Sequence, residues 1–192
     1  KSECWTGKAE NVDFFDLKGD LESILSLTEV GSRVKFVAKA HSALHPGQSA
    51  SIELDGKEIG FIGTIHPLIA QKLGLNGKAV VFEILWDAIA NRRVVQAKEI
   101  SKFPANRRDL ALVVADSVPA GDIIDACKQA GGEKLTQVNL FDVYQGIGVA
   151  SGHKSLAISL TIQDNEKTLE NDEINAVISA LLNEVKQRFN AE

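Results

Sequence analysis

The sequence predicts an α+β protein of two consecutive domains, and three observations support this fold class. Apolar residues recur at helical spacing in some segments and alternate in others, so helices and strands are mixed along the chain. The pair Asp55-Gly56 stands between two strand candidates and indicates a hairpin, hence an antiparallel sheet. A stretch without clear periodicity, residues 93–104, ends at a proline and separates the expected domains, residues 1–97 and 98–192.

The first domain is expected to combine an antiparallel sheet with peripheral helices. Residues 12–27 carry a broad apolar side and predict a helix, and Pro67 can start a second helix that runs to Leu73. Strands are expected at residues 34–38, 51–54, 58–63 and 79–85. The last strand is mostly apolar, which favours a central position in the sheet.

The second domain shows clearer periodicities, in the order βαββα. Strands are expected at residues 108–114, 135–144 and 155–163, and helices at residues 119–130 and towards the end of the chain. The last helix has apolar residues from Ile174 to Phe189 at helical spacing, with acidic residues at its start and basic ones at its end. A short strand around 98–103, or after residue 189, would complete a ferredoxin-like βαββαβ fold.

The strand at 155–163 predicts which sheet face stays uncovered. Leucines and isoleucines occupy one side, and the other side consists of small residues: Ser155, Ala157, Ser159 and Thr161. Small side chains let a flat ligand approach the backbone, and RNA-binding domains of this topology stack bases on that face. The alternative is a face that meets solvent without a ligand.

The composition is that of an ordinary soluble globular protein, and a cytoplasmic location is expected. Hydrophobic residues make up 44% of the 192 residues and charged residues 24%, which excludes disordered and fibrous classes. No apolar run approaches the roughly 20 residues that a membrane helix needs. The first residue is Lys1, and neither an initiator Met nor a signal peptide is present, so we interpret the chain as a fragment of a longer protein. Cys4 and Cys127 have no metal-ligand spacing and suit a reducing cytosol.

The charge distribution restricts how the chain could contact nucleic acid. The net charge of −5 argues against indiscriminate binding of RNA or DNA. Residues 164–192 hold 7 acidic and 3 basic residues, whereas residues 98–163 hold 7 of each. Any phosphate contact must therefore come from a local patch in the middle segment.

Several motifs resemble one family in order along almost the whole chain. Phe103–Val114 (FPANRRDLALVV) resembles the opening of the ferredoxin-fold anticodon-binding domain of bacterial phenylalanine–tRNA ligase β subunits. Asn139–Gly146 (NLFDVYQG) with Gly152–Ala157 (GHKSLA) resembles the central hairpin of that domain. In the first half, three segments resemble the β-subunit core: Asp13–Glu22 (DFFDLKGDLE), Leu44–Ala50 (LHPGQSA) and Ile59–Pro67 (IGFIGTIHP).

The resemblance implies a non-catalytic role within an enzyme. The family's ligase is an (αβ)₂ heterotetramer whose α subunit uses ATP and magnesium to attach phenylalanine to tRNA(Phe). Residues 1–97 would be part of a catalytically silent class II synthetase-like core, and residues 98–192 the anticodon-binding domain. The residues agree, because the first half shows no cluster of arginines and acidic residues that would suit ATP and magnesium. His41, His45 and His66 lack partners at metal-ligand spacing and are interpreted as turn residues, so no catalytic residue, metal or cofactor is expected here.

Four residues are candidates for the anticodon site by this resemblance. Tyr144 would stack the first anticodon base, a guanine, and Asp142 would accept hydrogen bonds from that base. Ser155 would lie nearby, and Ala111 corresponds to the family's small residue on the first strand. Alternation supports a shared face for this set, but it also places Val138 and Leu140 on the face of Tyr144 unless the strand bulges or twists.

The densest basic stretch of the chain is the candidate for phosphate contacts. It includes Lys98, Lys102, Arg107 and Arg108, and Lys154 stands beside Ser155. A solvated charged linker is the alternative for these residues. For the whole chain, the alternatives are a standalone RNA-binding module of ferredoxin-like fold and a structural or regulatory domain.

Overall fold

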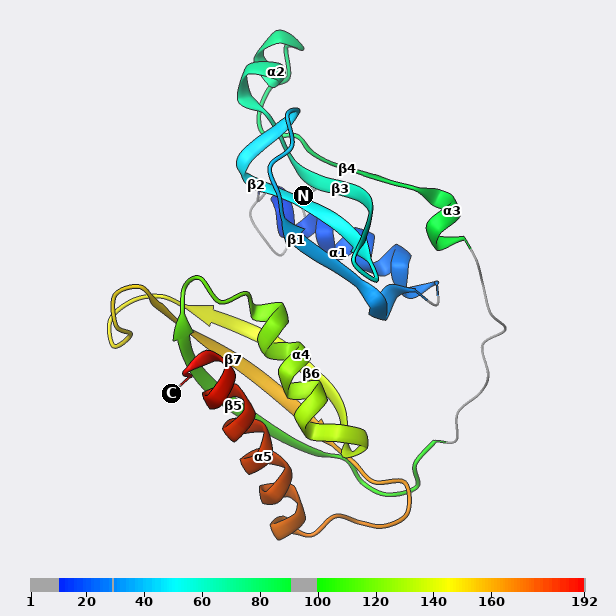
Figure 1. The fold of residues 1–192 in the computed structure, drawn as a ribbon, viewed down its shortest axis with the longest axis vertical. Helices are drawn as coiled ribbons and strands as arrows, with labels where there is room; N and C mark the ends of the chain where they lie inside the picture. Colours follow the sequence, from blue (N-terminus) through cyan, green and yellow to red (C-terminus); the bar gives the residue numbers. More distant parts are fainter. Residues whose placement is uncertain (1–10, 29, 91–99, 192) are drawn as a thin grey trace, which may run out of the picture. The chain divides into compact units, whose positions relative to one another are not determined.

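A computed structural model describes residues 11–28, 30–90 and 100–191 of the chain (Figure 1). The chain divides into two compact units, residues 1–96 and residues 97–192, which we call the first and second units. Each unit encloses a hydrophobic cluster of its own. The predicted boundary between residues 97 and 98 lies outside the described residues.

The first unit is a four-stranded antiparallel sheet with a helix against one face. The strand order is β1 (Val34–Ala38), β2 (Leu44–Leu54), β3 (Lys57–Ile65) and β4 (Val80–Ile84). Helix α1 (Phe14–Ser26) packs on the sheet through Leu21 and Leu25, which are buried with Ile52 and Ile62. The remaining helical segments are short: η1 (Gly31–Arg33), α2 (Pro67–Lys72) and α3 (Trp86–Ile89).

Local sequence accounts for the boundaries of these elements. The Asp13 carboxylate accepts from the amides of Phe15 and Asp16, and the Asp16 carboxylate accepts from the Asp13 amide, so α1 begins with a capping box. The predicted hairpin is confirmed, because Asp55 and Gly56 connect β2 to β3 with positive φ angles of 51° and 78°.

Two predictions for the first unit were wrong. Strand β4 lies at the sheet edge, and among the described residues it pairs only with β3. Its apolar composition has another cause, since Phe82 and Ile84 pack against the core beside α1. His45, interpreted as a turn residue, lies inside β2, where the register with β3 shifts between Leu44 and Ser49.

The second unit is a three-stranded antiparallel sheet with two helices on one face. The strand order is β5 (Asn106–Ala115), β7 (His153–Ile162) and β6 (Leu135–Tyr144). Helices α4 (Ala120–Gly131) and α5 (Asn171–Phe189) lie side by side over this sheet (Figure 1), and η2 (Gly132–Lys134) leads into β6. Cys127 of α4 is a free thiol buried in the hydrophobic cluster of this unit, and desolvation raises its pKa to about 11. Cys4 lies outside the described residues.

The last strand of the predicted βαββαβ fold is not present among the described residues. Neither residues 100–103 nor residues 190–191 form a strand, while residues 98, 99 and 192 lie outside the description. The chain instead approaches the sheet through side-chain bonds. The Ser101 hydroxyl donates to the Asp164 carbonyl at 2.7 Å, and the Gln163 amide donates to the Phe103 carbonyl at 2.7 Å. Pro104 then follows, and a proline has no N–H to offer a ladder.

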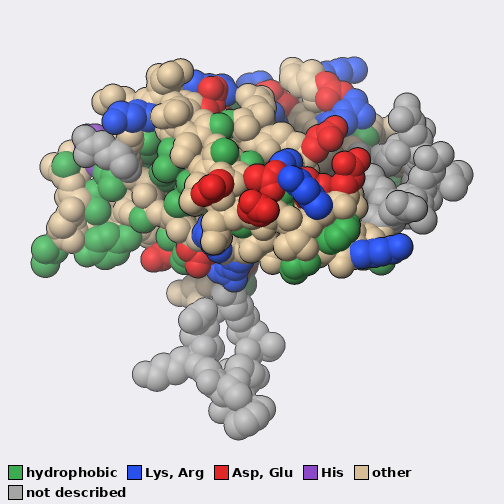
Figure 2. All heavy atoms as spheres, turned by 90° about the horizontal axis from the view of Figure 1, so that it is seen from below, with side chains coloured by type: hydrophobic (Ala, Val, Ile, Leu, Met, Phe, Trp, Pro, Cys, Tyr) green, Lys and Arg blue, Asp and Glu red, His purple; other side chains and the backbone are tan. Residues whose placement is uncertain are grey.

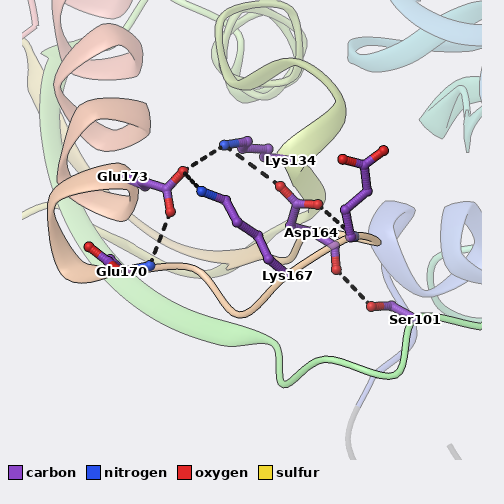
Figure 3. Close-up of polar contacts among 7 residues, drawn as sticks. Ser101, Lys134, Asp164, Lys167, Glu170 and Glu173 are labelled. Carbon is purple, nitrogen blue, oxygen red and sulfur yellow. Dashed lines mark hydrogen bonds and ion pairs between the residues drawn. The ribbon is translucent and has the colours of Figure 1, made fainter.

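Charged side chains fasten the start of α5 to the end of the sheet (Figure 3). Lys167 Nζ lies 2.9 Å and Lys134 Nζ 3.3 Å from the same Glu173 oxygen, and Lys134 also reaches Asp164 at 3.7 Å. The Glu173 carboxylate additionally accepts from the Glu170 amide at 3.3 Å. These bonds, led by the one from Lys167, lower the pKa of Glu173 to about 2.

Candidate anticodon-binding face

Among the described residues, no helix covers one face of the second unit's sheet, and the residues of this face follow from the strand register. We call it the open face. Residues that pair directly across adjacent antiparallel strands share a face. On β7 the buried leucines and isoleucines point to the helices, so the residues that alternate with them, together with their partners on β5 and β6, form the open face. Its members are Arg107, Asp109, Ala111 and Val113 on β5, Thr161, Ser159, Ala157 and Ser155 on β7, and Gln137, Asn139, Asp142 and Tyr144 on β6.

The four candidate anticodon residues come together on this face. Tyr144 lies opposite Ser155, and Asp142 lies opposite Ala157 in the neighbouring row. On the other side of β7, Ala111 also lies opposite Ala157, so Ala111 and Asp142 flank one small residue. The candidates therefore occupy two adjacent rows of one face.

A bulge in β6 makes this arrangement possible. The register between β6 and β7 shifts between Leu140 and Asp142, so Phe141 is an additional residue in β6. Before the bulge, Leu140 pairs with Ile158 and packs with Val138 against the core. After the bulge, Asp142 and Tyr144 belong to the open face. The conflict that alternation posed for Val138 and Leu140 is thereby resolved.

Tyr144 is positioned by the loop that follows it. Its side chain is 48% exposed, and its hydroxyl donates to the Ile147 carbonyl at 3.2 Å. The ring thus combines a solvent-accessible surface with a hydroxyl that bonds to the loop backbone. An exposed aromatic ring of this kind can stack a base.

Asp116 anchors the same loop to the turn after β5. Its carboxylate accepts from the Gln145 side-chain amide at 2.8 Å, and its carbonyl accepts from Lys154 Nζ at 2.9 Å. Lys154 lies opposite Val114, on the helix-covered side of the sheet. Its ammonium group is therefore directed to a backbone carbonyl and not to the open face.

The predicted phosphate-contacting residues are divided between the two faces. Arg107 belongs to the open face and forms an ion pair with Asp109 at 3.0 Å. Arg108 lies opposite Leu160 on the other face, where its guanidinium donates to the Arg107 carbonyl at 3.0 Å. Lys102 is exposed in the segment before β5, and Lys98 lies outside the described residues.

Two exposed amides on the open face escaped prediction from the sequence. Asn139 lies opposite Ser159, and Gln137 lies opposite Thr161. Strict alternation counted back from Tyr144 assigns both residues to the helix-covered face, and only the bulge places them on the open face.

On the surface that Figure 2 presents, acidic and basic side chains are intermixed, in line with the modest net charge of −5.

Comparisons with known proteins identify the family of this chain. Residues 101–192 match the model of the ferredoxin-fold anticodon binding domain, and residues 1–86 match that of the phenylalanyl tRNA synthetase beta chain CLM domain. Over 192 residues the chain is 83% identical to the phenylalanine–tRNA ligase beta subunit of Haemophilus influenzae (strain 86-028NP). The chain belongs to the phenylalanine–tRNA ligase β-subunit family. The resemblance stated from the sequence motifs is thus confirmed.

More distant relatives extend the same match. The beta subunits of Pasteurella multocida (strain Pm70) and Yersinia pestis are 75% and 58% identical over 191 and 189 residues, or 100% and 98% of this chain. Each alignment, like that with Haemophilus influenzae, covers 24% of the relative, so the chain spans about a quarter of these β subunits.

Within the described part of the chain, none of the helices is long and apolar enough to cross a membrane. No group of three or more His, Cys, Asp or Glu side chains in it could hold a metal ion.

Proposed function

We propose that this chain recognises tRNA(Phe) within an ATP-dependent phenylalanine–tRNA ligase, with the open face of the second unit against the anticodon. One observation carries the proposal: Tyr144, Asp142, Ser155 and Ala111 lie in two adjacent rows of a helix-free sheet face. The match of residues 101–192 to an anticodon-binding domain supports it.

Tyr144 and Asp142 divide the task between affinity and choice of base. Stacking on a tyrosine ring tolerates any base, since every base has a π face. An ionised carboxylate only accepts hydrogen bonds. Guanine offers two adjacent donors on its Watson–Crick edge, N1–H and the exocyclic amine, whereas adenine offers one donor there. Asp142 therefore favours guanine at the position that Tyr144 stacks.

Ala111 and Ser155 complete the site in different ways. Ala111 adds no bulk beside Ala157, so a flat base can approach the sheet backbone in the row of Asp142. Ser155 is half-buried opposite Tyr144, where its hydroxyl can donate to or accept from the same nucleotide. Lys102 and Arg107 contribute phosphate contacts that hold the RNA without reading its sequence.

The first unit serves assembly and not catalysis in this proposal. It forms part of a catalytically silent class II synthetase-like core that packs against a catalytic α subunit in a cytoplasmic (αβ)₂ enzyme. ATP and magnesium bind to that α subunit, and this chain holds no cofactor. Neither a membrane nor DNA is a partner.

Direct binding tests the proposal. We would titrate the chain with two anticodon stem-loop RNAs that differ only in guanine or adenine at the first anticodon position. We expect tighter binding of the guanine RNA, a loss of affinity of about tenfold for both RNAs in Tyr144→Ala, and a loss of discrimination in Asp142→Ala. Equal binding of both RNAs by the unaltered chain and both variants would assign the open face to another partner.

A further inference from the structure

Gly146 lies against the phenol end of the Tyr144 ring. A Cβ atom placed on Gly146 would stand 2.6 Å from the Tyr144 hydroxyl oxygen and 2.9 Å from Cζ. Both distances are shorter than side-chain carbons tolerate, so any residue other than glycine forces a movement here. Tyr144 and Gly146 are therefore packed as a pair.

Backbone conformation does not explain this glycine. Gly148 and Gly152, in the same loop, have φ angles of 96° and 77°, which lie in the left-handed region that favours glycine. Gly146 is not among the residues with positive φ. A left-handed backbone therefore does not require glycine at this position, and the contact with Tyr144 is what a side chain would disturb.

The loop cannot readily retreat from an added methyl group. Gln145, next to Gly146, is bonded to the Asp116 carboxylate, and the Gly146 carbonyl accepts from the Val149 amide at 3.1 Å. The far end of the loop is tied to the same turn, because the Asp116 amide donates to the Gly152 carbonyl at 2.9 Å. These bonds hold the loop on both sides of Gly146.

The Tyr144 ring, in contrast, can move at little cost. It is half exposed, and its bond to the Ile147 carbonyl can be exchanged for one to water. A methyl group on Gly146 therefore displaces the ring and leaves the fold intact.

We infer that Gly146 is a positioning residue for base recognition: the bare backbone at this position sets where the Tyr144 ring presents its stacking surface. This inference rests on the proposed function of Tyr144. It extends the recognition site from the sheet into the loop after β6.

The single tyrosine of the chain provides a specific probe. In protein labelled with 3-fluorotyrosine, the one ¹⁹F resonance reports the surroundings of the Tyr144 ring. We expect Gly146→Ala to shift this resonance in the free protein and to weaken binding of the guanine stem-loop about fivefold or more, at an unchanged melting temperature. Gly121→Ala is the matched control, since its Cβ meets nothing within 4 Å and its φ is not positive.

A second variant tests the contact itself. The hydroxyl oxygen is the atom nearest to the added methyl group, so Tyr144→Phe should relieve part of the Gly146→Ala effect. When Gly146→Ala is combined with Tyr144→Phe, the loss of affinity that it causes should shrink to about half or less on a logarithmic scale.

The outcomes separate this inference from the proposed function. If Tyr144→Ala weakens binding and Gly146→Ala neither shifts the resonance nor weakens binding, the positioning role is wrong and the proposed function stands. If Tyr144→Ala binds RNA as the unaltered chain does, the proposed function itself fails. A lowered melting temperature in Gly146→Ala with an unmoved resonance would assign Gly146 to folding and also refute the positioning role.

Discussion

Leu140 and Asp142 stand two positions apart on one strand, yet their side chains belong to opposite faces of the sheet. Leu140 lies opposite Ile158 in the core, and Asp142 lies opposite Ala157 on the open face, because Phe141 is inserted between them as a bulge. The bulge lets one strand supply core residues at its start and recognition residues at its end.

The face assignment before the bulge predicts a contrast between two neighbouring residues. Leu140→Ala removes half-buried packing and should lower the free energy of unfolding by about 1–2 kcal/mol. Asn139→Ala, on the exposed side, should change it by less than about 0.5 kcal/mol. Urea denaturation of both variants measures this, and equal losses would contradict the register before the bulge.

The basic residues should differ in the same way according to face. Arg107→Ala and Lys102→Ala should each weaken binding of stem-loop RNA and reduce the slope of log K against log salt by about one unit or less. Arg108→Ala should leave that slope unchanged, because its guanidinium lies on the helix-covered side and bonds to the Arg107 carbonyl. Titrations at several salt concentrations compare the three variants. A slope reduced by Arg108→Ala alone would overturn this division.

The two faces of β7 were predictable from the sequence, whereas those of β6 were not; β7 itself begins at His153 and ends at Ile162, against an expected range of 155–163. Residues 155–162 alternate without interruption, so Ser155 and Ala157 could be assigned to the open face from the sequence alone. The bulge at Phe141 has no comparable signal, because a phenylalanine fits a regular strand equally well. Hence Asn139 and Gln137 were missed, although Tyr144 and Asp142 were placed correctly relative to Ser155.

The face of Arg108 and the edge position of β4 differ in how far the sequence could predict them. Arg108 alternates in step with Leu110 and Leu112, so its position away from the open face could be read from the sequence; its phosphate contact stays a prediction. The edge position of β4 could not be deduced, because the composition of a strand reports what covers its faces and not how many strands flank it.

The Glu173 cluster predicts a pH dependence of stability. The pKa of Glu173 falls from 4.5 to about 2 in the folded protein, chiefly through the bond from Lys167. A depressed carboxyl pKa contributes stability above pH 4.5, and this contribution is lost as the pH falls from there through about 2. Glu173→Gln should therefore lower the melting temperature at pH 7 and have little effect near pH 2.

A neighbouring carboxylate is the control for that measurement. Asp172 also lies in the first turn of α5, outside the cluster of Figure 3. Asp172→Asn keeps Lys134 and Lys167 on Glu173 and should not reproduce the pH-dependent difference. Melting curves of both variants between pH 2 and pH 7 decide the matter. A difference between Glu173→Gln and the unaltered protein that is constant over this range would refute the role of the ionised pair.

Tyr144 provides the most direct test of the proposed function in the assembled ligase. Tyr144→Ala, introduced into a complete β subunit with its α subunit, should lower kcat/KM for tRNA by about one to two decades, as expected for the loss of one stacked base. Phenylalanine activation should be unaffected, because the proposal assigns that step to the α subunit. Tyr144→Phe should be mild, since the ring stacks the base and the hydroxyl bonds only to the Ile147 carbonyl. Aminoacylation and pyrophosphate exchange, measured in parallel, separate the two steps. Charging by Tyr144→Ala at the wild-type rate, at limiting tRNA, would show that the open face does not read the anticodon.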